Sequence, residues 1–85
     1  MNIYKIYQDT NNDYDTFDSA IVYARDEERA KRLHPGGGIN ENETEDGTYS
    51  SWTAVKNVKV QLIGTAPENG DEYNEGVILA SFNAG

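Results

Sequence analysis

The sequence predicts an α+β fold, a small and mostly antiparallel β-sheet with one short helix, in the order β-β-α-β-β. Four segments rich in β-branched and aromatic residues are typical of strands. One further segment has the capping residue and the charge order of a helix. At 85 residues the chain has apolar material for a single core, so we expect residues 1–85 to form one domain.

The first two strands are expected at residues 2–8 and 17–24. Both segments combine β-branched and aromatic side chains with partial alternation of polar and apolar positions. Asn and Asp residues at 11–13 are typical of a turn between them. The two strands should therefore form an antiparallel hairpin with a long loop.

The helix is expected at residues 26–34. Asp26 can cap its first turn, which carries acidic residues, while basic residues occupy its last turn, as the helix dipole favours. Ala30 and Leu33 are the only residues of its apolar stripe, so the helix must lie on a sheet to be stable. Proline and glycine at 35–38 should end it.

The second half of the chain predicts a long loop and two more strands. Residues 36–51 are polar and acidic, and a loop of this length is expected to be mobile or to bind a partner. Residues 57–63 alternate, which places one apolar row on a single face: Val58, Val60 and Leu62. Residues 77–82 form a continuous apolar run, which predicts a strand at the sheet centre, covered on both faces.

The charge of the chain is strongly negative, −8 from 15 acids and 7 bases. Most of the acids fall in three loop-like stretches, 9–18, 41–46 and 68–75, which contain no Lys or Arg. If these stretches meet at one end of the fold, they create a negative field that steers a basic partner toward it. The charge disfavours direct nucleic-acid binding, which needs clustered bases. A simpler interpretation is that the acidic loops keep the protein soluble.

Metal and catalytic chemistry find little support in the residues. The chain has no cysteine, which excludes disulfides and thiolate sites. Residues 9–15 place oxygen ligands at alternate positions, as a calcium loop does, but Tyr14 stands where that loop needs glycine and Ala20 where it needs glutamate. The single histidine, His34, is expected to stabilise the last carbonyls of the helix. We therefore expect no metal, no cofactor and no enzymatic activity.

The location is expected to be cytoplasmic. No apolar stretch is long enough for a membrane span. The first residues have neither the basic nor the apolar region of a secretion signal.

Four pieces of the chain resemble a family of small uncharacterised proteins encoded by bacteriophages. They are the segment 14–22, the segment 24–30 followed by His34-Pro35, Trp52-Thr53 with 58–66, and 76–85, which reads GVILASFNAG. The resemblance covers about two thirds of the chain, omits the acidic loops and implies a phage or prophage origin, with the host cytoplasm as the place of action. It carries over no established activity or site residue. Small acidic phage proteins are often inhibitors of host defence, which is an analogy at the level of a class.

The favoured hypothesis is an inhibitor of a host antiviral defence system. Like anti-CRISPR inhibitors, it would bind a basic, nucleic-acid-handling surface of a host protein and use its acidic loops in place of phosphates. Trp52 would add an aromatic anchor. The candidate contact residues are Asp13, Asp15, Glu41, Glu43, Glu45, Asp46, Trp52, Glu68, Asp71 and Glu72.

Two other functions remain open. One is a sponge that sequesters a nucleotide immune signal, with Arg25, Arg29 and Arg32 binding the anion. Such a sponge would be a homo-oligomer, because 85 residues leave little room for an enclosed pocket. The other is a phage structural or accessory module.

Overall fold

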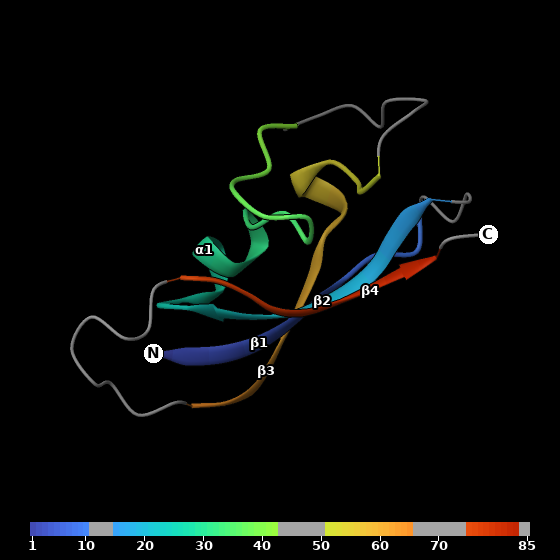
Figure 1. The fold of residues 1–85 in the computed structure, drawn as a ribbon. Helices are drawn as coiled ribbons and strands as arrows, with labels where there is room; N and C mark the ends of the chain where they lie inside the picture. The colour runs from blue at the N-terminus through green and yellow to red at the C-terminus, as the bar shows by residue number, and fades with distance from the viewer. Residues whose placement is uncertain (11–14, 43–50, 66–74, 84–85) are drawn as a thin grey trace.

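The computed structural model describes residues 1–10, 15–42, 51–65 and 75–83. Within these residues the protein is mostly β, with one short α-helix (Figure 1). The observed order differs from the predicted one, because a short 3-10 helix, η1, lies between the α-helix and the third strand. The elements are β1 Asn2–Tyr7, β2 Thr16–Ala24, α1 Glu27–Lys31, η1 Val55–Asn57, β3 Lys59–Thr65 and β4 Gly76–Asn83.

The four strands form one antiparallel sheet in the order β3-β1-β2-β4 (Figure 1). β1 and β2 pair from Asn2 opposite Ala24 to Tyr7 opposite Ser19. The predicted hairpin is therefore confirmed, and its two strands occupy the sheet centre. β3 pairs with the outer side of β1 and β4 with the outer side of β2, so β3 and β4 form the two edges of the sheet.

The prediction that residues 77–82 form the sheet centre is wrong. β4 is an edge strand, and Ile78, Leu79 and Phe82 are 44%, 67% and 45% exposed. A continuous apolar run fits a covered strand, but it also fits an edge strand with one covered and one open face. Here Val77 and Ala80 pack against the core, while Leu79 pairs with Ile21 on the other face.

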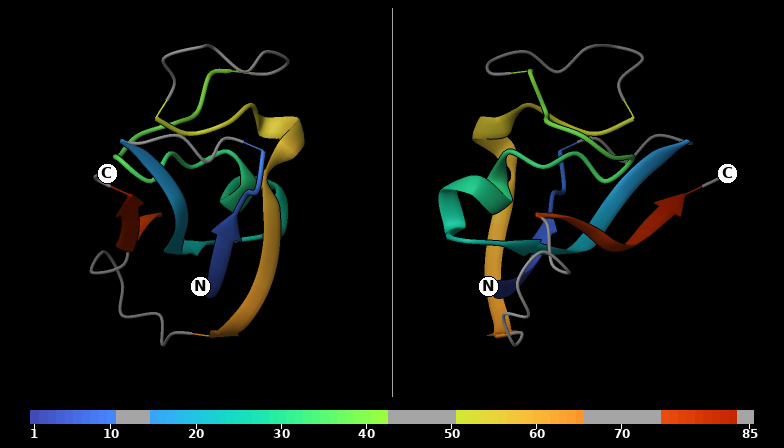
Figure 2. Two further views of the ribbon diagram at one scale, coloured as in Figure 1. Left: turned by 90° about the vertical axis from the view of Figure 1, so that its right-hand side faces the viewer. Right: turned by 60° about the vertical axis from the view of Figure 1, so that its left-hand side comes forward.

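The core lies on one face of the sheet, under α1 and the described residues 33–40 and 52–58 (Figure 2). Tyr4 and Ile6 of β1 point to this face, as their burial shows, while the residues between and beside them are only partly buried. The buried cluster consists of Tyr4, Ile6, Ala20, Val22, Ala24, Ala30, Leu33, Trp52 and Val58.

β3 follows the predicted alternation only in part. Val58, just before it, is buried and Val60 packs against the core, but Leu62 is 57% exposed. Because β3 is an edge strand, its residues do not all lie under the layer that covers the core.

α1 is shorter than the helix predicted over 26–34. The predicted cap is confirmed, because Oδ1 of Asp26 accepts a hydrogen bond from the backbone N–H of Arg29 at 2.9 Å. The helix ends early because the chain reverses, with Leu33 in an antiparallel bridge to Ile39. Neither helix in the described ranges is long and apolar enough to cross a membrane.

The reversal depends on two glycines, Gly37 and Gly38, at φ 110° and 78°. These left-handed conformations favour glycine, because a side chain at such φ values is strained. The sequence predicts that the loop over 36–51 is mobile or binds a partner, and its first part, residues 36–42, is hydrogen-bonded to the rest of the structure. Asn40 is buried, its Nδ2 donates to the Thr53 carbonyl at 2.9 Å, and its N–H donates to the Arg32 carbonyl at 2.7 Å. Residues 43–50 lie outside the described residues.

Candidate functional site

The described acids of the first two acidic stretches are exposed and lie near the β1–β2 hairpin. Asp9 follows β1, Asp15 precedes β2 and Asp18 lies at an irregularity of β2. Asp15 has φ 61°, a left-handed conformation that aspartate adopts more readily than most residues. Glu41 is also exposed.

A network of polar groups, of which Gln8, Asn40 and Thr53 are buried and Thr10 is exposed, holds Glu41 at the same end of the sheet as the hairpin. The backbone N–H of Thr10 donates to Oε1 of Gln8 at 2.8 Å, and the Thr10 and Thr53 hydroxyls lie 2.9 Å apart. Thr53 in turn accepts the side-chain amide of Asn40, the residue before Glu41. Because hydrogen bonds satisfy these buried groups, they fix the local backbone at little cost in free energy.

The third acidic stretch starts and ends at the other end of the sheet. Thr65, at the end of β3, pairs with Asn2, and Gly76, at the start of β4, pairs with Tyr23. Both pairs are remote from the hairpin, and so is Glu75, the one described acid of this stretch, so the described acids of the three stretches do not all meet at one end. The other predicted contact residues of the acidic stretches lie outside the described residues: Asp13, Glu43, Glu45, Asp46, Glu68, Asp71 and Glu72.

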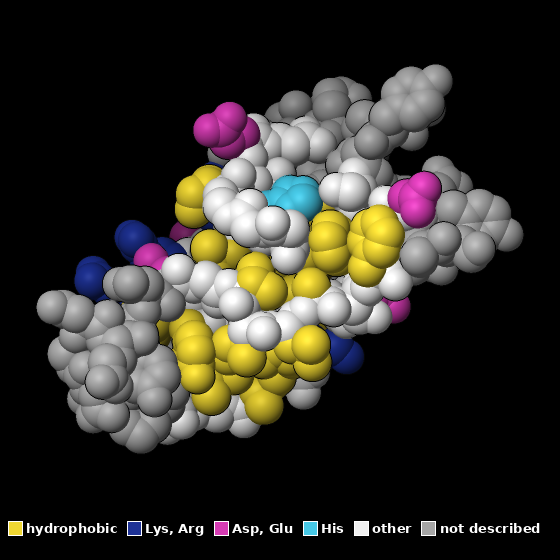
Figure 3. Space-filling view, viewed as in Figure 1, with side chains coloured by type: hydrophobic (Ala, Val, Ile, Leu, Met, Phe, Trp, Pro, Cys, Tyr) yellow, Lys and Arg dark blue, Asp and Glu magenta, His cyan; other side chains and the backbone are white. Residues whose placement is uncertain are grey.

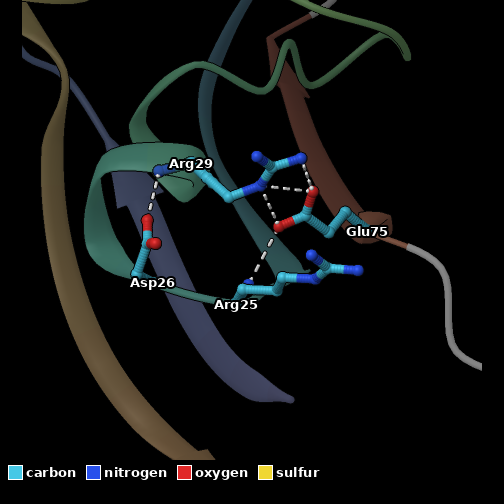
Figure 4. A network of polar contacts seen from close by, with 4 residues as sticks. All are labelled: Arg25, Asp26, Arg29 and Glu75. Carbon is cyan, nitrogen blue, oxygen red and sulfur yellow. Dashed lines mark hydrogen bonds and ion pairs between the residues drawn. The ribbon is translucent and has the colours of Figure 1, made fainter.

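Glu75 joins the start of β4 to α1 through Arg25 and Arg29 (Figure 4). Its Oε2 accepts the backbone N–H of Arg25 at 2.9 Å, and both carboxylate oxygens lie 2.7 Å from Nε of Arg29. The Glu75 side chain is 19% exposed. Burial acts to raise the pKa of Glu75, but the hydrogen bonds and charges of Arg25 and Arg29 lower it below its usual 4.5.

Two of the three arginines proposed for anion binding, Arg29 and Arg32, have carboxylate partners within the chain, while Arg25 contacts Glu75 through its backbone N–H. Arg29 binds Glu75, and Nε of Arg32 lies 3.3 Å from Oε1 of Glu28. A cavity of about 160 Å³ lies beside these groups, and another of about 280 Å³ lies between α1 and β3. Both are below the several hundred Å³ of a typical ligand pocket.

Trp52 is a core residue, and its prediction as a partner contact is wrong. The side chain is 1% exposed and packs in the cluster with Tyr4, Ile6 and Val22. The large ring of Trp52 packs onto the core face of the sheet and is closed off from solvent, so a partner cannot reach it.

His34 also differs from its expected role. Nδ1 accepts the backbone N–H of Gly36 at 2.9 Å, and the ring meets Phe17 edge-on with centroids 6.0 Å apart. An accepting Nδ1 requires the neutral imidazole with its proton on Nε2, so the ring caps a turn rather than the helix carbonyls. Burial lowers the pKa of His34. No group of three or more metal-ligating side chains occurs among the residues that the structure describes.

Sequence reasoning missed an uncovered sheet face. Because Tyr4 and Ile6 point to the core, the alternate residues of β1 point away from it. The residues of β2 that pair with these alternate residues, and those of β4 that pair with β2 at the same level, point the same way. Figure 3 shows hydrophobic side chains gathered on this side of the sheet, away from α1. We call it the open face, and it consists of Ile3, Lys5, Tyr7, Ile21, Tyr23 and Leu79.

The signal for this face was present in β1 and β2, whose apolar residues occupy both alternating rows rather than one. Local composition cannot indicate which of the two rows of side chains is covered by the helix, so the open face cannot be identified from the sequence.

Comparison with protein-family models, with curated proteins and with solved structures gave no match.

Proposed function

We propose that this chain is an acidic, non-enzymatic binding protein that inhibits a host antiviral defence system. It would occupy a basic, nucleic-acid-handling surface of a host protein and use its acids in place of phosphates. The observation that carries the proposal is the group of exposed carboxylates near the hairpin, in a chain of net charge −8: Asp9, Asp15, Asp18 and Glu41.

The placement of these acids supports a binding role. They flank paired strands and a hydrogen-bonded turn, so their backbone is already ordered. Binding a partner therefore costs less conformational entropy than it would if the same acids lay in an unfolded segment. The Lys59 ammonium lies 3.2 Å from Oδ2 of Asp9, and both side chains are more than half exposed. An exposed pair of this kind contributes little to stability, so a cation of the partner can replace Lys59.

The nucleotide sponge has less support. Two of its three arginines, Arg29 and Arg32, pair with Glu75 and Glu28, so an anionic ligand at those two side chains would have to displace carboxylates of the same chain. No observation favours a structural or accessory module.

The test compares two variants with the same change of charge. Asp18→Asn with Glu41→Gln neutralises two acids near the hairpin, and Glu27→Gln with Glu28→Gln neutralises two exposed acids of α1. The tagged wild-type chain is used to capture its host protein from lysate, and mass spectrometry identifies that protein. Association rates with the purified host protein are then measured at rising salt concentrations.

The hairpin variant should associate about threefold or more slowly at low salt, because it weakens electrostatic steering toward the basic surface. It should also depend less on salt, because screening has less attraction to remove. The α1 variant should behave like the wild type. Equal rates for the hairpin variant and the wild type, in both binding and phage-protection assays, would refute the proposal.

A further inference from the structure

β4 is an edge strand without the usual protection against pairing. One side of it pairs with β2, and no other strand of the described residues pairs with its outer side. It is eight residues long and contains neither a charged residue nor proline. Natural sheets block their edges with charges, prolines or very short strands, because an open edge presents unpaired backbone groups to another strand.

The opposite edge of the sheet is protected. β3 begins with Lys59, whose ammonium contacts Asp9, and this pair places two charges beside the strand. A strand added at β3 would have to displace or accommodate them. Of the two edges, β4 is the one suited to pairing.

The side chains of β4 extend the exposed apolar surface toward this edge. Leu79 is 67% exposed and lies opposite Ile21, so the open face continues into the strand (Figure 3). Ile78 is 44% exposed at the irregularity between β2 and β4. A strand docked at β4 would remove part of this apolar surface from water, which is favourable.

We propose that the occupant of the β4 edge is β4 of a second copy of this chain, antiparallel to the first about a two-fold axis. The distribution of charge favours β4 over the other described strands as the contact between two copies. Each copy carries −8, so two copies repel wherever their acids face each other. Among the described helices and strands, β4 is the one element with no charged residue, so the repulsion is least there.

The geometry also suits identical partners. A two-fold interface brings the same surface of each copy together, so the strand must be complementary to itself. An uncharged apolar strand satisfies this in an antiparallel pair, and it offers no charge by which another partner would be selected. The product is one continuous sheet of eight strands. This inference does not rest on the proposed function.

Sedimentation velocity of the purified chain tests the inference. The wild type should reach about twice the monomer mass of 9.5 kDa as its concentration rises. Leu79→Glu should raise the dissociation constant about tenfold or more, because it places a charge against its own copy at the two-fold interface. Leu62→Glu is the matched control, since Leu62 is 57% exposed on the other edge, and it should leave the dimer intact.

A second measurement needs no variant. Amide exchange of β4 in the wild-type chain should slow as the concentration rises, because pairing protects its outer N–H groups. Added salt should tighten the dimer by screening the repulsion between copies, the opposite of its effect on binding to a basic partner.

Three results would overturn the inference. The first is a wild-type chain that stays at 9.5 kDa at every concentration. The second is a dimer that Leu62→Glu disrupts as strongly as Leu79→Glu. The third is exchange in β4 that does not change with concentration.

Discussion

Two isoleucines of β1 test which face of the sheet holds the core. Ile6 is 0% exposed and belongs to the core cluster, whereas Ile3, three residues away, points to the open face and is only half-buried. The same substitution at the two positions, Ile6→Ala and Ile3→Ala, removes the same atoms from the same strand. Any difference between the two changes in unfolding free energy therefore measures the packing on each face.

The structure gives the expected size of the difference. Ile6→Ala deletes three carbon atoms that are fully buried, and their transfer from water accounts for about 2.4 kcal/mol. The cavity that remains adds about 1 kcal/mol or more, so the total is about 3 to 4 kcal/mol. A domain of 85 residues has a free energy of unfolding of about 4 to 13 kcal/mol, so the variant should lose between about a quarter and all of it. Ile3→Ala should lower the free energy by about 1 kcal/mol.

Urea unfolding followed by tryptophan fluorescence measures both variants. Trp52 is the single tryptophan and is 1% exposed, so its emission reports on loss of the core. The m-value should not change, because the surface exposed on unfolding is nearly the same. If Ile3→Ala is as destabilising as Ile6→Ala, the covered and open faces have been assigned the wrong way round.

Three further predictions follow from individual contacts. The free energy of unfolding should fall as the pH falls. The pKa values of His34 and Glu75 are lower in the folded chain than their ordinary values of 6.5 and 4.5, so the unfolded chain binds these protons more readily. The stabilisation linked to His34 therefore declines below pH 6.5, and that linked to Glu75 declines below pH 4.5. In pH titrations of urea midpoints, Glu75→Gln should reduce the lower step, and an unchanged step would contradict the role given to Glu75. Asp15→Val should lower the free energy of unfolding by about 1 to 2 kcal/mol because of the positive φ, while Asp15→Asn should change it by less than about 0.5 kcal/mol, and equal effects would exclude backbone strain. Thr53→Val should cost about 1 to 2 kcal/mol in thermal or urea unfolding, because it removes a buried hydroxyl that bonds to its neighbours, and a neutral result would show that the network is not stabilising.

Much of the local structure could be predicted from the sequence alone. Asp26 caps the helix as expected, because a cap needs only a side chain and the amide three residues on. The β1–β2 hairpin and the existence of all four strands also follow from local composition and turn residues. The exposure of Asp9, Asp15, Asp18 and Glu41 is equally local, since charged side chains stay in water unless they are paired.

The tertiary structure decided everything that depends on neighbours distant in the chain. Arg29 and Glu75 are 46 residues apart, and no local pattern indicates that they meet. Trp52 was a candidate partner contact, yet its side chain is 1% exposed and packs in the core. The chain by itself determined that 76–83 is a strand, but only pairing with β2 decided that it is an edge, because its apolar pattern fits either place.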